Sequence, residues 1–207
     1  TGAFGQPVEA YYATNGRLAV FEMADICGLE KVPMNQRSPL TLTTKGVGEM
    51  IGHLVDLGVE EIMIGVGGSS TNDGGLGMAA GLGYRFFDKT GHEVEAIGEH
   101  LGDITMVSYE SCRWDLSQIK VTVITDVTNP LCGPNGATYI FGEQKGLAKD
   151  KFASIDKDME RFYQTFFPAV LDLAGAGAGG GMAAGLAAFA GGQIISGIDA
   201  VLDMLDF

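Results

Sequence analysis

A short apolar run that ends in glycines and small polar residues is the feature that most constrains the fold of this 207-residue chain. Residues 62–75 read IMIGVGGSSTNDGG, and LGMAAGLG follows directly. The apolar part is typical of a buried strand, and the second tract is typical of a helix. Bare backbone beside hydroxyl, amide and carboxylate groups can approach a ligand closely, and a helix N-terminus favours an anion there. The stretch therefore predicts a strand, a ligand-binding loop and a helix.

The segments on either side of this stretch predict an alternating α/β chain. Asn15-Gly16 is a strong hairpin signal between two strand-like segments, residues 8–13 and 17–23. Apolar residues recur at helical spacing over 44–57, where either Thr43 or Thr44 can cap the helix. The strand 61–66 and a helix over 75–82 then complete an α/β unit.

Further elements extend the same pattern toward the C-terminus. We predict a helix from residue 24, strands at 84–88, 120–127 and 193–196, and helices at 148–167, 182–190 and 198–205. No linker divides the chain and no repeat is visible. We expect one α/β domain over residues 1–207, with a central, mostly parallel or mixed sheet flanked by helices and an N-terminal hairpin.

Charge and cysteine content exclude several classes of function. The formal net charge is −13, so the chain would repel nucleic acid and anionic membranes, and we expect neither as a partner. An anionic substrate would need local hydrogen-bond donors or a metal ion. Three scattered cysteines without CxxC or Cys/His spacing favour reduced thiols in the cytoplasm, and no apolar run is long enough to span a bilayer.

Polar side chains follow two of the predicted strands. Asn72 and Asp73 come after one, and Asp126 and Asn129 come at the end of the other. Ligands of open α/β sheets bind at the carboxyl ends of the strands. Carboxylates there can hold Mg²⁺ or accept a proton from a substrate hydroxyl. The alternative interpretation is local: Asn72 and Asp73 can cap the following helix, and Asn129-Pro130 can form a plain turn.

A glycine-rich tract near the C-terminus allows two interpretations. Gly175, Gly177 and Gly180 match GxGxxG, and Asp199 lies about twenty residues further on, as in a dinucleotide fingerprint. However, the preceding AVLDLA is no clear strand, and close helix–loop packing would need the same glycines. A nucleotide-binding regulatory module and a non-catalytic interaction domain therefore stay open as alternatives. Lys145, taken alone, is typical of a solvated surface lysine.

Four blocks of sequence carry a family resemblance. They are VFEMADICGL, IGVGGSSTNDGGLGMAAGLGYRF, DVTNPLCGPNGATYIFGEQKG and GAGAGGGMAAGLAAF, in this order along the chain. Their order and motifs resemble the type I glycerate kinases, the bacterial family that includes glycerate 2-kinases, over most of the chain. GGSSTNDGG and DVTNPLxGPxGA with FGxQKG are long and specific.

The resemblance implies an activity and a domain arrangement. Family members phosphorylate D-glycerate with ATP and Mg²⁺, giving 2-phosphoglycerate in the typical bacterial case. They have two α/β domains: a Rossmann-like one formed from both ends of the chain, and one inserted in its middle. The family's Asp-Ser-Phe-Lys-Gly and Gly-Glu-Gly-Arg motifs are absent from residues 1–207. We therefore expect the chain to be the inserted domain alone, supplying the substrate side of the cleft and inactive without the Rossmann-like domain.

For the intact kinase, the resemblance suggests roles for the loop residues. Asp73 would act as the base or orient the substrate hydroxyl, with Asn72 in the catalytic set. Asp126 would help to hold Mg²⁺ or the substrate, with Asn129 beside it. Lys145 would offer a cation to a phosphate. The residues expected to bind the carboxylate or the transferring phosphate, or to let the backbone approach a ligand, are Gly67, Gly68, Ser69, Ser70, Thr71, Gly177, Gly179 and Gly180.

Overall fold

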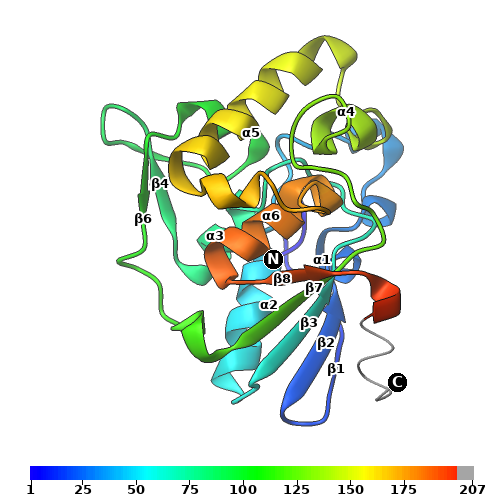
Figure 1. Cartoon of the computed structure of the whole chain (residues 1–207), viewed down its shortest axis with the longest axis vertical. Coiled ribbons are helices and arrows are strands. Elements are labelled where there is room, and N and C mark those ends of the chain that lie inside the picture. The colour runs from blue at the N-terminus through cyan, green and yellow to red at the C-terminus, as the bar shows by residue number, and fades with distance from the viewer. Residues whose placement is uncertain (200–207) are drawn as a thin grey trace.

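The computed structural model describes residues 1–199, which form a mixed central sheet with helices around it (Figure 1). Within these residues the sheet has five strands in the order β1-β2-β3-β7-β8. β1 pairs antiparallel with β2, whereas β2, β3, β7 and β8 run parallel. The strands are β1 (Tyr12–Thr14), β2 (Leu18–Glu22), β3 (Glu61–Gly65), β7 (Lys120–Ile124) and β8 (Gln193–Ile195). The predicted mixed sheet and N-terminal hairpin are therefore confirmed.

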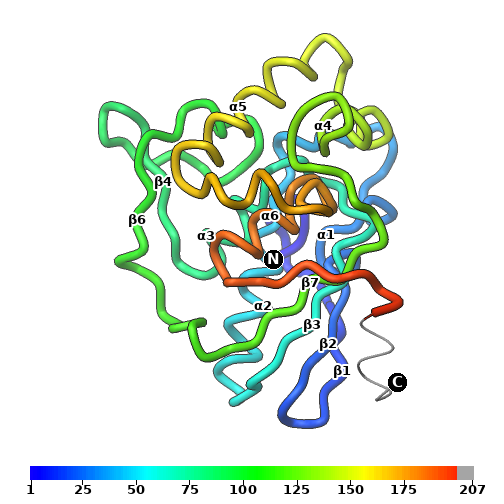
Figure 2. The backbone as a smooth tube through the Cα atoms, in the orientation of Figure 1, coloured from blue at the N-terminus to red at the C-terminus, as the bar shows by residue number. Residues whose placement is uncertain are grey.

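Side-chain alternation along the strands separates the two faces of the sheet. Ile62 and Ile64 belong to the main hydrophobic core, together with their cross-strand neighbours on β2 and β7. Met63, between them, points to the opposite face, since successive side chains of a strand alternate. The helices are α1 (Ala24–Cys27), α2 (Lys45–Asp56), α3 (Leu76–Leu82), α4 (Ala137–Phe141), α5 (Phe152–Phe166) and α6 (Ala178–Ala190), and Figure 2 follows their connections.

A small second sheet lies away from the first. Its order is β5-β4-β6, with both neighbours antiparallel to the central strand. The strands are β4 (Arg85–Phe87), β5 (Glu93–Val94) and β6 (Met106–Ser108). The sequence predicts only the first of them, because strands of two or three residues are too short to show a period of alternation. Short 3₁₀ turns occupy Leu29–Lys31, Met34–Gln36, Gly98–Asp103, Leu116–Gln118, Glu143–Lys145, Lys149–Lys151 and Pro168–Val170.

The predicted starts of two helices are confirmed. α2 begins at Lys45, whose N–H donates to Thr43 Oγ1 at 3.2 Å, while Thr44 Oγ1 donates to Asp73 Oδ2 at 2.6 Å and accepts from the Met78 backbone N–H at 2.8 Å. α6 spans Ala178–Ala190, but residues 179–181 have left-handed backbone, so regular helix begins at Met182 as predicted. The helix predicted over 198–205 lies outside the described residues from residue 200 onward.

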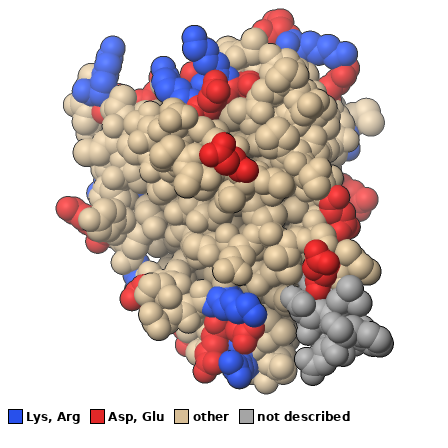
Figure 3. Space-filling view, in the orientation of Figure 1, with Lys and Arg blue, Asp and Glu red and all other residues tan. Residues whose placement is uncertain are grey.

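The surface shows where the charges of this acidic chain gather. In Figure 3, charged side chains concentrate at the upper and lower ends of the visible face, with a mainly uncharged area between them. Within residues 1–199, no helix combines the length and apolar character needed to cross a membrane.

Candidate active site

A cavity of about 380 Å³ opens at the carboxyl ends of β2, β3 and β7. Figure 1 shows these strands converging toward α1 and the start of α6. The volume lies in the range of about 300–1,000 Å³ that is typical of small-molecule sites. Its walls are Glu22, Leu29, Gly65, Val66, Gly67, Gly68, Ser69, Ile124, Thr125, Asp126, Val127, Phe141, Gln144, Lys145, Ala178 and Gly179.

The loop after β3 contributes only its first half to this cavity. Gly67, Gly68 and Ser69 line it. The second half, Ser70–Asp73, has no exposed surface and lies beneath the cavity wall. Of the five loop residues expected to bind ligand, Gly67–Thr71, the structure therefore places only Gly67, Gly68 and Ser69 at the cavity.

Asp73 occupies a fully buried position behind the loop. Its Oδ1 accepts from the Gly75 backbone N–H at 3.0 Å, and its Oδ2 accepts from the Gly77 N–H at 3.1 Å and from the Thr44 hydroxyl at 2.6 Å. Burial raises the pKa of this carboxyl, and the three hydrogen bonds oppose the shift. These contacts support the interpretation that Asp73 fixes the start of α3. Asp73 is not among the residues that line the cavity.

Asn72 lies in the same buried layer. Its Nδ2 donates to Thr138 Oγ1 at 3.1 Å, which ties the loop to α4. Within residues 1–199, Asn72 Oδ1 and Thr71 Oγ1 are buried without a hydrogen-bond partner. Asn72 does not line the cavity, so its contacts favour a structural role.

Lys145 is buried, not solvated as its sequence context alone suggests. It is 3% exposed, and its Nζ donates to Ser69 Oγ at 2.6 Å and to the Thr71 carbonyl at 2.8 Å. Burial lowers the pKa of this amine to about 8, while the charges of Asp73 and Cys27 oppose the shift. Lys145 also lines the cavity. The site therefore carries a cation that is held in place by the glycine-serine loop.

Asp126 lines the cavity and Asn129 does not, as with the two halves of the loop after β3. Asp126 lines the cavity, and its Oδ1 accepts from the Gly197 backbone N–H at 3.0 Å. Asn129 Nδ2 donates to the Asn135 carbonyl at 2.8 Å, so this side chain stabilises its own loop and does not reach the cavity. Asp126 is the member of this pair that a ligand can contact.

The donor set of the cavity fits a loosely held Mg²⁺. No group of three or more His, Cys, Asp or Glu side chains occurs among residues 1–199, so no all-protein metal cage is present there. Mg²⁺ in kinases is usually bound by one or two carboxylates together with substrate phosphates and water. Asp126 lines the cavity and can supply such a carboxylate.

The second glycine tract serves mainly close packing. A Cβ atom on Gly180 would lie 2.1 Å from the Thr71 carbonyl oxygen, and one on Gly177 would lie 2.3 Å from the Pro130 carbonyl oxygen. Only Gly179, of the three glycines expected at the site, lines the cavity. A 3₁₀ turn, Pro168–Val170, precedes the tract where a dinucleotide fingerprint requires a strand. The geometry favours the packing interpretation.

Several cavity residues were not predicted from the sequence. Glu22 is the last residue of β2, whose place beside β3 rests on pairing across about forty residues of chain. Phe141 and Gln144 stand inside the FGEQKG block, where only the lysine was singled out, and Thr125 directly precedes Asp126. Their position at strand ends and beside a known motif is the signal that could have found them.

The fold is an open-sheet α/β domain, and its cavity has the size and the place that are typical of a small-molecule site. The sequence model of the glycerate kinase family matches residues 1–207, and the chain belongs to this family. It is 48% identical over 208 residues to the glycerate kinase of Neisseria meningitidis and 39% identical over 212 residues to the glycerate 2-kinase of Escherichia coli. Each alignment covers 100% of this chain and 56% of the relative.

A solved structure agrees with this assignment. The chain superposes on a crystal structure from Salmonella typhimurium, named as a candidate glycerate kinase 2, with a TM-score of 0.94 and 43% sequence identity. The match covers 100% of this chain and 57% of the other. The chain thus spans about half the length of the relatives that it matches.

Proposed function

We propose that the longer protein containing this chain phosphorylates D-glycerate with ATP and Mg²⁺ and releases 2-phosphoglycerate. In this proposal residues 1–207 are the inserted α/β domain and supply the substrate side of the cleft. The missing Rossmann-like domain of the same protein supplies the nucleotide side, and the enzyme works in the cytoplasm. The observation that carries the proposal is Lys145, a buried cation held by Ser69 and Thr71 at the wall of the cavity.

The cavity residues suggest how glycerate would be bound. The substrate carboxylate would accept hydrogen bonds from the backbone of Gly67 and Gly68, where no side chain blocks its approach. Lys145 would neutralise its charge, or that of the transferring phosphoryl group. Asp126 would hold Mg²⁺, which supplies charge neutralisation to the phosphates when bound. Phosphoryl transfer depends mainly on such positioning and electrostatic stabilisation.

The same observations weigh against the alternative functions. A dinucleotide-binding module lacks its strand before the glycine tract. A purely structural domain gives no reason for a lysine with its amine buried at a cavity wall, since burying an ammonium group is costly.

A coupled ATP/D-glycerate assay tests the proposal. The full-length protein should turn over with ATP, Mg²⁺ and D-glycerate, and ³¹P NMR should show the phosphate on the 2-hydroxyl. Residues 1–207 alone should show no turnover, because they span 56% of the family relatives. A full-length protein without glycerate-dependent ATP consumption would contradict the proposal.

A further inference from the structure

Glu22 lines the cavity and stands in the VFEMADICGL block, for which the sequence suggested no role. It is the last residue of β2 and is paired in register with Gly65, the last residue of β3. The next residue, Met23, continues the ladder by donating its N–H to the Gly65 carbonyl at 2.9 Å. Both strands end at the cavity, so the paired end of β2 holds the Glu22 side chain at the rim of the cavity.

Gly65 provides the space for the Glu22 carboxylate. A Cβ atom on Gly65 would lie 2.1 Å from Glu22 Oε2 and 2.4 Å from Oε1. The carboxylate therefore lies directly over the Gly65 backbone, and any other residue at position 65 would displace it. Gly65 is the only glycine of β3, and it is the last residue of this strand.

Glu22 also makes fewer hydrogen bonds than the other carboxylates around the site. Among residues 1–199 its oxygens have neither a hydrogen-bond donor nor an ion-pair partner, and its side chain is exposed. By contrast, Asp126 accepts from the Gly197 N–H, and both oxygens of Asp73 are used by backbone and hydroxyl donors. A carboxylate that must accept a substrate proton needs free lone pairs, and Glu22 has them.

The charges around Glu22 favour a proton acceptor. Asp25 of α1 lies close to it in sequence, and Asp126 and Lys145 line the same cavity from β7 and from the turn after α4. Partial burial in the cavity wall, followed by the charge of Asp25, raises the pKa of Glu22 above its ordinary value. A stronger base near neutral pH takes a proton more readily while it remains mostly ionised.

We propose that Glu22 is the group that accepts the proton from the attacking hydroxyl of glycerate, a role that rests on the proposed kinase function. The hydroxyl oxygen forms a bond to the γ-phosphorus of ATP, and the bond from that phosphorus to the β,γ-bridging oxygen breaks. ADP leaves with that electron pair. The hydroxyl proton passes to a Glu22 carboxylate oxygen, which later returns it to water. Glu22 thus takes the role that the sequence suggested for Asp73.

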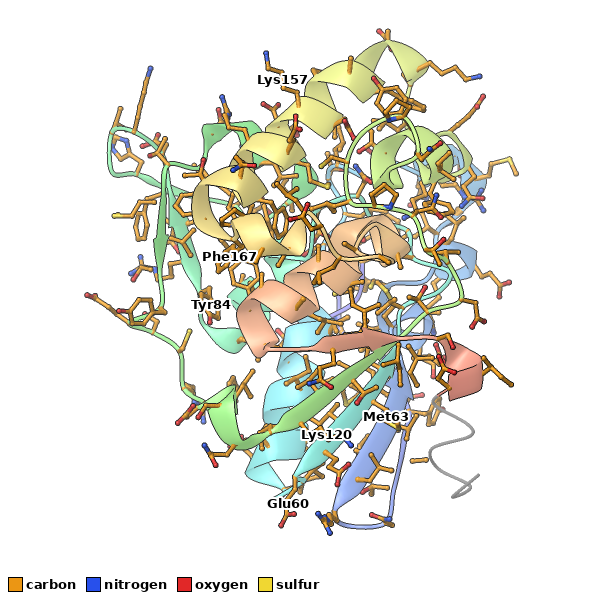
Figure 4. The ribbon with its side chains drawn as sticks, in the orientation of Figure 1. Glu60, Met63, Tyr84, Lys120, Lys157 and Phe167 are labelled. Atoms are coloured by element: carbon orange, nitrogen blue, oxygen red, sulfur yellow. The ribbon has the colours of Figure 1, made fainter. Side chains whose placement is uncertain are left out.

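Kinetics of the full-length protein test this assignment. Glu22→Gln keeps the size of the side chain and should lower kcat by roughly 100-fold or more, the range of general base catalysis. Glu60→Gln is the matched control, because Glu60 lies at the opposite end of the sheet, where β3 begins (Figure 4). It should retain wild-type kcat. The kcat of Glu22→Asp should lie between those of the two variants, since aspartate keeps the carboxylate on a shorter side chain.

The pH profile separates a base from a merely structural residue. In the wild type, kcat should fall as the pH drops through the raised pKa of Glu22, because the protonated carboxyl cannot accept a proton. In Glu22→Gln this acidic limb should vanish from the residual activity. Wild-type kcat in this variant would overturn the assignment. So would an unchanged acidic limb together with about tenfold weaker Mg²⁺ activation, which would make Glu22 a metal ligand.

These outcomes are separable from the failure of the proposed function. If the wild-type full-length protein does not phosphorylate glycerate, the kinase proposal itself fails. If it does, and Glu22→Gln behaves like Glu60→Gln, only the role of Glu22 is wrong.

Discussion

Asp73 and Asp126 look alike in the sequence and differ in the structure. Each is an aspartate in a polar loop that follows a strand of the central sheet. Asp73 has no exposed surface and is held by Thr44, Gly75 and Gly77. Asp126 is exposed at the cavity and keeps a single backbone partner. The polar residues near this site therefore form two layers, one that a ligand can contact and one that is buried.

We call these layers the cavity wall and the buried layer. The cavity wall contains Glu22, Ser69, Asp126 and Lys145, which a ligand can contact. The buried layer contains Thr44, Ser70, Thr71, Asn72, Asp73 and Thr138, which connect α2, α3 and α4 to the loop after β3. Changes in the wall should alter catalysis, whereas changes in the buried layer should alter stability.

The largest effect should come from filling the contact between the glycine tract and the buried layer. In Gly180→Ala, the new Cβ would lie 2.1 Å from the Thr71 carbonyl, and φ at this position is +73°. Overpacking and the left-handed backbone together should cost about 4 kcal/mol of unfolding free energy. Urea unfolding of the full-length protein measures this loss.

Gly133→Ala is the matched control for that variant. Its φ is +88°, yet nothing lies within 4 Å of the added Cβ. It should cost only about 1–2 kcal/mol, from backbone strain alone. Equal losses in the two variants would mean that the contact with Thr71 contributes nothing.

The next largest loss of stability should come from Asp73→Asn. Asp73→Asn replaces one acceptor oxygen by an NH₂ group, so the Gly77 N–H and the Thr44 hydroxyl lose their partner. Breaking a buried charged network of this kind should cost about 3 kcal/mol. Thermal unfolding checks this, and an unfolding free energy within 0.5 kcal/mol of the wild type, roughly the size of a surface change, would contradict it.

A smaller effect should follow the loss of the cavity cation. Lys145→Met should raise KM for D-glycerate roughly 30-fold at pH 7, which corresponds to about 2 kcal/mol for a charge-assisted contact. In the wild type, KM should rise as the pH increases through the Lys145 pKa of about 8, since the neutral amine no longer attracts the carboxylate. In Lys145→Met that rise should disappear.

Lys149→Met serves as the control for Lys145. Lys149 is 70% exposed and pairs with Glu143 on the surface. Its replacement should leave KM and its pH dependence unchanged. If both lysine variants bind glycerate equally well, Lys145 has no part in the site.

The smallest effect should come from a single hydrogen bond of the buried layer. Ser70 Oγ donates to the Cys27 carbonyl at 2.8 Å. Ser70→Ala should cost about 1 kcal/mol of stability and leave kcat unchanged. A kcat reduced severalfold without loss of stability would move Ser70 from the buried layer to the cavity wall.

Much of the fold was predictable because its signals are local. The hairpin at Asn15-Gly16, the strand that ends in Gly65 and the amphipathic α5 each follow from neighbouring residues. The second sheet was not predictable to the same degree, because β5 has only two residues and carries no period.

The location of the site could be predicted from the sequence, but several of its residues could not. The polar residues after the strands correctly indicated the carboxyl edge of the sheet. The burial of Lys145, however, depends on Ser69, which is 76 positions away in the chain. Likewise, Glu22 reaches the cavity only because β2 pairs with β3 in a register that places it opposite Gly65. Such long-range pairing leaves no periodic signal in a single sequence.

The most direct test of the two-layer account measures kcat and unfolding free energy together for Asp126→Asn and Asp73→Asn in the full-length protein. We expect Asp126→Asn to lose most of the glycerate kinase turnover and to stay within about 0.5 kcal/mol of wild-type stability, the spread of surface substitutions. Asp73→Asn should show the larger loss of stability. The opposite result, a stable and inactive Asp73→Asn beside a destabilised but fully active Asp126→Asn, would contradict it.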